Sequence, residues 1–151
     1  MPFEVSVFRM LKRQFPTVEK VSVRASAGVS FYLVISMQPR FAGEPRQVIM
    51  AAMASNIRPK WTIIVDPDID VHSSTDVEWA MAFRVQPHRD VIIVDNVPAG
   101  PSDPSVDLTR DRTMRTASMI GIDATRPFGE PFYEVADVPG WEDFEMPELE
   151  K

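Results

Sequence analysis

Apolar and polar residues alternate along the chain with two periods, one typical of helices and one typical of strands. Helical spacing predicts an amphipathic helix over 3–15, which ends before Pro16. Two valine-rich runs follow, over 18–25 and 29–37. The second is apolar on both faces, as is typical of a strand covered on both sides of a sheet. The Ser-Ala-Gly between the two runs predicts a hairpin.

The middle of the chain alternates helices with apolar strands. Helical spacing predicts a helix over 43–55, and near-continuous apolar runs predict strands over 61–65 and 91–94. Between these strands, a helix over 75–84 begins with Thr-Asp-Val-Glu, which has the spacing of a capping box. Two strands joined by one helix predict a right-handed βαβ crossover, so we expect 61–65 and 91–94 to be a parallel pair.

Beyond residue 95 the periodicity is lost. Residues 102–116 are polar, and 117–124 form one more short apolar run that predicts a strand. The sequence therefore predicts an α/β fold, with a single domain over 1–128 that has a mixed sheet, a parallel βαβ core and flanking helices. An extended acidic, proline-rich C-terminal tail is predicted over 129–151.

Composition excludes several classes of protein. The 151 residues have a formal net charge of −6, which argues against a phosphate-backbone partner, so we expect no nucleic acid. The chain has no cysteine, which excludes a disulfide framework, a thiolate zinc site and a cysteine nucleophile. No apolar run approaches the roughly 20 residues of a membrane span. We therefore expect no membrane span and a cytoplasmic location.

Three aspartates at alternate positions, Asp66, Asp68 and Asp70, follow a predicted strand. This spacing is that of the start of a calcium loop, which also needs a glycine at its sixth position and a glutamate at its twelfth. Valine occupies both positions here, so no metal ligands are predicted. We interpret these aspartates, together with Asp95 and Asp123 near other strand ends, as structural polar residues that cap turns or face a ligand crevice.

One further group has the residue types of a hydrolytic triad. His72 lies beside Ser73, Ser74 and Asp70. However, the chain has no Gly-x-Ser-x-Gly nucleophile elbow and no glycine-rich phosphate loop. A small independent hydrolase is therefore the less favoured alternative.

Arg84, at the end of a mostly apolar helix, has two interpretations. A buried arginine normally has a carboxylate partner, for which Asp66, Asp95 and Asp123 are the candidates. Alternatively, Arg84 is exposed on the last helical turn.

Four segments together carry a family resemblance: IIVDPDID at 63–70, DVEWAMAFRVQP at 76–87, HRDVIIVDNVP at 88–98 and SMIGIDAT at 118–125. As a set they resemble the C-terminal domain of the UbiD family of prenylated-flavin-dependent (de)carboxylases. The resemblance implies a carboxy-lyase that acts on aromatic or α,β-unsaturated carboxylic acids.

In that family the flavin site, the metal ligands and the acid–base residues lie in earlier domains. The resemblance therefore implies no catalytic, cofactor-binding or metal-binding residues in this chain. Prenylated FMN and a divalent metal are expected in a partner or missing domain. The family's C-terminal domain supplies a wall of the substrate cleft and a subunit interface, and by resemblance the cleft candidates are Phe83, Arg84, Asn96, Val97 and Pro98. Family members usually carry threonine where Phe83 stands, so the larger ring implies a narrower pocket.

The expected partner is a flavin-binding UbiD-like catalytic subunit or domain. The chain would then be either a separate small subunit or a piece of a longer enzyme, and it would be inactive alone. Whether the chain also forms a homo-oligomer is left undecided by the sequence. The alternative to a cleft wall is a purely structural or oligomerisation module.

Overall fold

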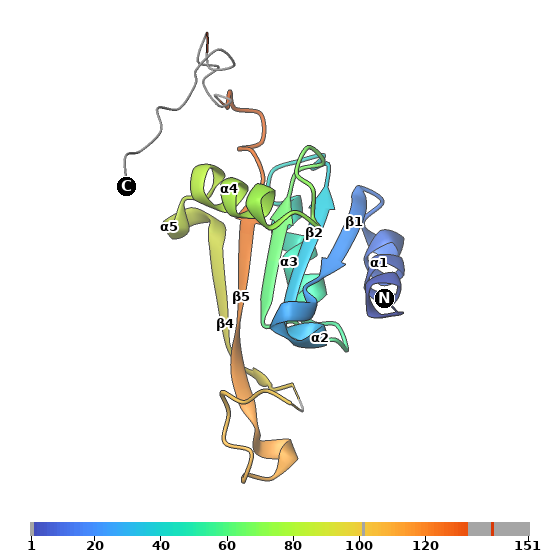
Figure 1. The fold of residues 1–151 in the computed structure, drawn as a ribbon, viewed down its shortest axis with the longest axis vertical. Coiled ribbons are helices and arrows are strands. Elements are labelled where there is room, and N and C mark those ends of the chain that lie inside the picture. Colours follow the sequence, from blue (N-terminus) through green and yellow to red (C-terminus); the bar gives the residue numbers. More distant parts are fainter. Residues whose placement is uncertain (1, 101, 133–139, 141–151) are drawn as a thin grey trace, which may run out of the picture.

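A five-stranded mixed sheet forms the centre of the computed structural model, which describes residues 2–100, 102–132 and 140 (Figure 1). Its spatial order is β1-β2-β3-β5-β4. β2, β3 and β5 run parallel, and β1 and β4 pair antiparallel at the two edges. The predicted α/β class is confirmed. The strands are β1 (Val18–Val23), β2 (Tyr32–Met37), β3 (Trp61–Val65), β4 (Val91–Pro98) and β5 (Thr116–Ala124).

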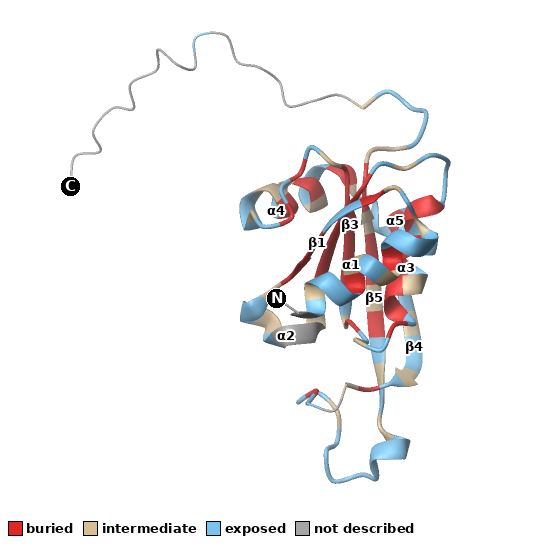
Figure 2. Cartoon of the chain, turned by 90° about the vertical axis from the view of Figure 1, so that its right-hand side faces the viewer, coloured by how far each residue is buried: buried red, intermediate tan, exposed pale blue. Residues whose placement is uncertain are grey.

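Helices cover both faces of this sheet (Figure 2). α1 (Pro2–Gln14) and α3 (Glu44–Met53) pack on one face, where their apolar residues share a buried cluster with β1, β2 and β3. α4 (Ser74–Arg84) packs on the other face, over a second cluster that includes Val34, Ile63 and Ile122. Burial of the central strands on both sides explains why their sequences are almost continuously apolar.

The predicted parallel pairing of β3 with β4 is wrong. β3 pairs in parallel with β2 and β5, whereas β4 pairs with β5 in the antiparallel direction. α4 and the short α5 (Pro87–Asp90) stay near the edge where the parallel strands end, and Val91 opens β4 opposite Ile122 of β5. The chain therefore enters β4 from the edge at which it left β3. The parallel crossover of the core is β2–α3–β3.

Two local predictions also need correction. The chain between β1 and β2 contains a 3-10 turn, η1 (Ala25–Ala27), and a short helix, α2 (Gly28–Phe31), so β2 begins later than predicted although the antiparallel pairing holds. The cap of α4 is Ser73, whose hydroxyl accepts the Asp76 N–H at 3.2 Å. Thr75 lies inside the helix, because the serine two residues earlier satisfies the free N–H group.

Beyond the sheet, β4 and β5 continue into an arm that ends in a loop with a 3-10 turn, η2 (Arg112–Met114) (Figure 1). Most of the predicted acidic tail lies outside the described residues, and the domain boundary at 128 stays a prediction. Within the described part of the chain, every helix is too short or too polar to cross a membrane.

Candidate functional site

Polar side chains gather where the parallel strands end. Asp66 and Asp68 follow β3 directly, and Asp123 and Thr125 lie at the end of β5. Ligands of open α/β sheets bind outside the carboxyl ends of the strands. This edge of the sheet is therefore the candidate site.

Arg84, the last residue of α4, is buried at this edge with 3% of its surface exposed. Its Nη1 donates to Asp66 Oδ2 at 2.8 Å, and its Nη2 donates to Asp68 Oδ2 at 2.7 Å. The guanidinium carbon also lies 5.1 Å from the ring centroid of Trp79 and 5.5 Å from that of Phe132. The structure therefore agrees with the interpretation of Arg84 as a buried residue. Its partner Asp66 is one of the three carboxylates named as candidates from the sequence.

The same two carboxylates hold the chain that follows β5. Asp66 Oδ2 accepts the backbone N–H of Arg126 at 2.7 Å, and Asp68 Oδ2 accepts Nη2 of Arg126 at 2.9 Å. Burial raises the pKa of Asp66, whereas the hydrogen bond from Arg84 holds the pKa of Asp68 below its usual value. Asp68 is therefore the more firmly ionised member of the pair.

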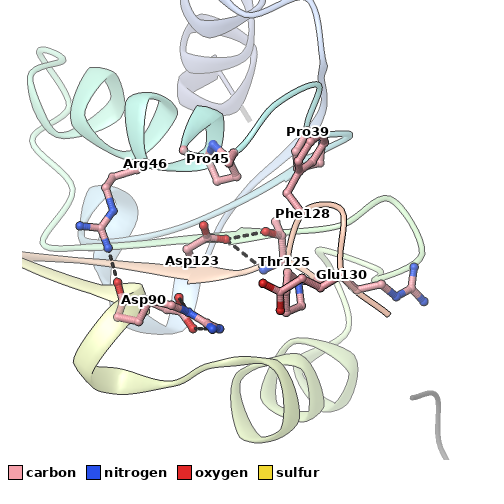
Figure 3. A pocket seen from close by; sticks show the side chains of 13 residues that line it. Pro39, Pro45, Arg46, Asp90, Asp123, Thr125, Phe128 and Glu130 are labelled. Atoms are coloured by element: carbon pink, nitrogen blue, oxygen red, sulfur yellow. Dashed lines mark hydrogen bonds and ion pairs between the residues drawn. The ribbon is translucent and has the colours of Figure 1, made fainter. Parts of the chain in front are cut away.

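Beside this cluster a pocket of about 260 Å³ opens between the start of α3 and the chain after β5 (Figure 3). Asp123 lies in it, and one carboxylate oxygen accepts the Thr125 hydroxyl at 2.7 Å and the Thr125 N–H at 3.1 Å. Burial raises the pKa of Asp123. Arg46, Arg89 and Arg126 also line the pocket, so it combines an easily protonated carboxyl group with cationic side chains.

Of the residues that line this pocket, Asp123 is the one named from the sequence, as a polar residue near a strand end. The other lining residues were not predicted. Arg46 donates to the backbone carbonyl of Arg89, and the guanidinium of Arg89 pairs with Asp90 at 2.7 Å. Asp90 ends the short helix α5, for which the sequence predicted no element. The run Thr-Arg-Pro-Phe at 125–128 could have pointed to the pocket from the sequence alone. It directly follows the last predicted strand and must therefore lie at a strand end, where it lines the pocket.

Phe83 and Arg84 differ sharply in exposure although they are neighbours in sequence. Phe83 is 64% exposed, and its ring centroid lies 5.4 Å from that of Trp79. Arg84 points inward to its two aspartates. Of these two candidates, Phe83 alone presents its side chain to a ligand or a partner.

Asn96, Val97 and Pro98 lie at the other end of β4, and the structure does not bring them together with Phe83 (Figure 1). β4 starts opposite Ile122, near the candidate edge, whereas Val97 lies opposite Ala117 at the far end of β5. Asn96 has φ 56° where the register of the strand pair shifts. The predicted second half of the cleft wall is thus remote from the first.

Two of the remaining predicted polar residues make hydrogen bonds outside the candidate site. Asp95 accepts the Ser118 hydroxyl at 2.8 Å across the strand pair, far from Arg84. Asp70 accepts the His72 N–H at 3.0 Å. The Ser73 hydroxyl donates to the Asp76 carboxylate and accepts the Asp76 N–H, so the α4 cap occupies one of the two serines that the hydrolase alternative offers as a nucleophile.

The pocket beside Asp123 is too small for a flavin mononucleotide. Ligands of that size occupy pockets of roughly 300–1,000 Å³, larger than the pocket beside Asp123. A groove of about 500 Å³ at the other end of α3 is large enough, but it is lined mainly by apolar side chains and its one cation, Arg58, donates to the carbonyl of Ala99. Within the described residues, no three acidic or histidine side chains are grouped to hold a metal ion.

Comparison with known proteins gives a family match over most of the chain. Residues 1–124 match the model of the 3-octaprenyl-4-hydroxybenzoate carboxy-lyase C-terminal domain, abbreviated UbiD_C. Anhydromevalonate phosphate decarboxylase of Aeropyrum pernix is 33% identical over 141 residues, which cover 93% of this chain and 31% of the relative. Phenolic acid decarboxylase of Sedimentibacter hydroxybenzoicus is 32% identical over 126 residues, which cover 82% of this chain and 25% of the relative.

Solved structures agree with this match. The UbiD-class enzyme HmfF from Pelotomaculum thermopropionicum, in complex with FMN, superposes with a TM-score of 0.78 at 30% identity, covering 94% of this chain and 31% of that one. Vanillic acid decarboxylase of Sedimentibacter hydroxybenzoicus in its closed form gives a TM-score of 0.74 at 26% identity, covering 93% and 30%. The chain therefore spans less than a third of the length of these relatives.

Proposed function

The chain belongs to the family of UbiD C-terminal domains, and we propose that it forms one wall of the substrate cleft in a UbiD-class carboxy-lyase. The family resemblance implies aromatic or α,β-unsaturated carboxylic acids as the substrate class, and two related proteins are named as phenolic acid and vanillic acid decarboxylases. Prenylated FMN and the divalent metal would be held by another subunit or domain. One of the related structures, an evolved dimeric HmfF, contains prenylated FMN.

The observation that carries the proposal is a pair of exposed aromatic rings at the edge where the parallel strands end. Phe83 is 64% exposed at the end of α4, and Phe128 is 50% exposed in the chain that follows β5. Phe128 also lines the pocket beside Asp123. Apolar rings beside cationic groups suit an aromatic carboxylate, which offers one apolar and one anionic part.

In this function the chain does not carry the bond-breaking groups. Its contribution is to exclude water from the cleft and to hold the aromatic part of the substrate in place, which lowers the entropic cost of reaching the reactive geometry. The vanillic acid decarboxylase of Sedimentibacter hydroxybenzoicus has been solved in closed and open forms.

The direct test is reconstitution with a flavin-binding UbiD-class subunit that lacks this domain. We expect the isolated chain to show no flavin absorbance even when it is produced together with the prenyltransferase that makes the cofactor. Turnover should appear only in the mixture. Flavin bound to the isolated chain at near one-to-one stoichiometry would contradict the proposal, as would a mixture that turns over no faster than the flavin subunit alone.

Phe83→Thr tests the wall directly. We expect the variant to change the ratio of kcat/KM between bulky and compact aromatic acids by about tenfold or more, because a pocket contact changes when the ring is removed. The melting temperature should stay close to that of the unchanged chain, since the ring is mostly exposed. Phe3→Thr, which removes a 46% exposed ring on α1, is the matched control and should leave the ratio unchanged. A loss of several kcal/mol in stability would instead identify Phe83 as a core residue.

A further inference from the structure

Four charged side chains form a closed cluster, here called the aspartate–arginine clamp: Asp66, Asp68, Arg84 and Arg126. Asp66 Oδ2 accepts from Arg84 Nη1 and from the backbone N–H of Arg126, at 2.8 and 2.7 Å. Asp68 accepts from both Nη atoms of Arg84, at 3.2 and 2.7 Å, and from Nη2 of Arg126 at 2.9 Å. Each carboxylate therefore bridges two segments of the chain.

The clamp joins elements that are distant in sequence. Asp66 and Asp68 stand at the end of β3, Arg84 is the last residue of α4, and Arg126 follows β5. The rings of Trp79 and Phe132 lie near the Arg84 guanidinium, at 5.1 and 5.5 Å from its central carbon. Arg84 and Asp66 are 3% and 5% exposed, so this part of the clamp is shielded from water.

Both parts of the proposed substrate wall adjoin the clamp directly. Phe83 precedes Arg84 on the last turn of α4, and Phe128 follows Arg126 by two residues in the segment that lines the pocket. A shift of either arginine would therefore move one exposed ring relative to the other. Such a fixed arrangement matters in an active site, because a misplacement of about 1 Å can lower a rate about a hundredfold.

Stability alone is a weak explanation for a buried ion pair. Taking the charges out of water costs about as much as their attraction returns, so apolar side chains of similar volume often stabilise a fold equally well. The geometry of this cluster offers something that apolar side chains do not. The planar guanidinium of Arg84 binds two carboxylates at fixed angles, and one of those carboxylates fixes a backbone N–H group.

We propose that Asp66, Asp68 and Arg84 are positioning residues, which hold the end of α4 and the segment 126–128 in one geometry so that Phe83 and Phe128 contact the substrate together. This inference rests on the proposed function as a cleft wall. None of the three side chains needs to touch the substrate. They act through Phe83 and through the backbone of Arg126.

The test uses Asp68→Asn, because Asp68 is at the exposed rim of the clamp and its side chain is 40% exposed. The variant keeps the shape but loses the charge that binds both arginines. We expect amide hydrogen exchange of the segment 124–132 to rise about tenfold, as expected for the loss of a charge-assisted hydrogen bond. We also expect kcat/KM of the reconstituted enzyme to fall about tenfold, mainly through kcat, with a nearly unchanged melting temperature.

Two further variants separate positioning from a general effect of charge. Asp70→Asn is the matched control, because Asp70 lies in the same loop and accepts the His72 N–H outside the clamp. It should leave both readouts unchanged. Arg84→Lys keeps the charge but loses the two-pronged contact, so it should loosen the segment as Asp68→Asn does.

The outcomes distinguish this proposal from the proposed function. If Asp68→Asn leaves either the exchange or kcat/KM at the level of the Asp70→Asn control, the positioning role is refuted while the cleft wall stands. An Arg84→Lys variant with both readouts intact also refutes it. If the unchanged chain fails to restore turnover to the flavin subunit, the cleft wall itself fails, and the positioning role fails with it.

Discussion

Individual carboxyl groups near the strand ends differ in how folding changes their affinity for a proton. Asp123 is half-buried, and burial raises its pKa in spite of two hydrogen bonds from Thr125. Asp95 is exposed, and the hydrogen bond from the Ser118 hydroxyl lowers its pKa. The two residues should therefore affect stability with opposite dependence on pH.

A raised pKa means that the folded chain binds the proton of Asp123 more tightly than the unfolded chain does. Asp123 therefore favours folding below its unfolded pKa of about 3.9, and this contribution is lost as the pH rises through the higher folded pKa. Asp123→Asn keeps an oxygen that accepts from Thr125 but removes the titration. We expect the free energy of unfolding of the variant, relative to the unchanged chain, to increase as the pH rises from acidic to neutral.

Urea unfolding at a series of pH values measures this difference. Asp95→Asn is the control with the opposite sign, because a lowered folded pKa adds stability above the unfolded pKa that is lost on acidification. Its effect should be small, since solvent screens an exposed group. Parallel pH profiles for the two variants would contradict the assignment.

Among the secondary-structure elements, α3 and β5 depend on a glycine for their close contact. A Cβ atom on Gly121 would lie 2.2 Å from Cγ2 of Ile49 and 3.0 Å from Cε of Met53. Gly121→Ala should therefore lower the free energy of unfolding by about 1–3 kcal/mol through overpacking. Gly100→Ala is the control, since its Cβ would meet only the edge of the Phe31 ring, at 3.2 Å. Equal losses in thermal unfolding of the two variants would show that the contact of α3 with β5 is not the cause.

The elements that sequence predicted best are those set by local pattern. The strand over 61–65 agrees with β3 residue for residue, because burial on both faces makes it continuously apolar. The direction of β4 was predicted wrongly, because it depends on the edge of the sheet at which α4 and α5 end. The residues of the strand itself do not determine it. The site follows the same division. The cost of a buried charge gave Asp66 as one of three possible partners for a buried Arg84, and only the structure selects it. The Arg126 N–H that Asp66 also accepts is a backbone group that no residue type reveals.

In the molecule as a whole, α4 leaves part of one sheet face uncovered. Tyr32, Trp61, Ile120 and Ile93 are cross-strand neighbours on four adjacent strands, so they form one apolar row on the α4 side of the sheet. The next row, Val34, Ile63, Ile122 and Val91, packs in the cluster that α4 shares. In the first row Trp61 is 40% exposed and Ile93 is 68% exposed. This row is the observation that favours the second candidate function, an oligomerisation module.

The row has an aromatic half and an aliphatic half, which suits a second copy of the chain. A two-fold axis through its middle would place Tyr32 of each copy on Ile93 of the other, and Trp61 on Ile120. Stable interfaces bury about 800 Å² on each partner, more than four side chains provide, so we expect a weak dimer that dissociates on dilution.

Ile93→Asp places a charge in the row and should shift the chain to the monomer across about a hundredfold range of concentration in sedimentation velocity. Leu108→Asp, at an exposed site on the arm away from the row, should leave the equilibrium unchanged. A chain that stays monomeric at the highest concentration would show that this row does not bind a second copy.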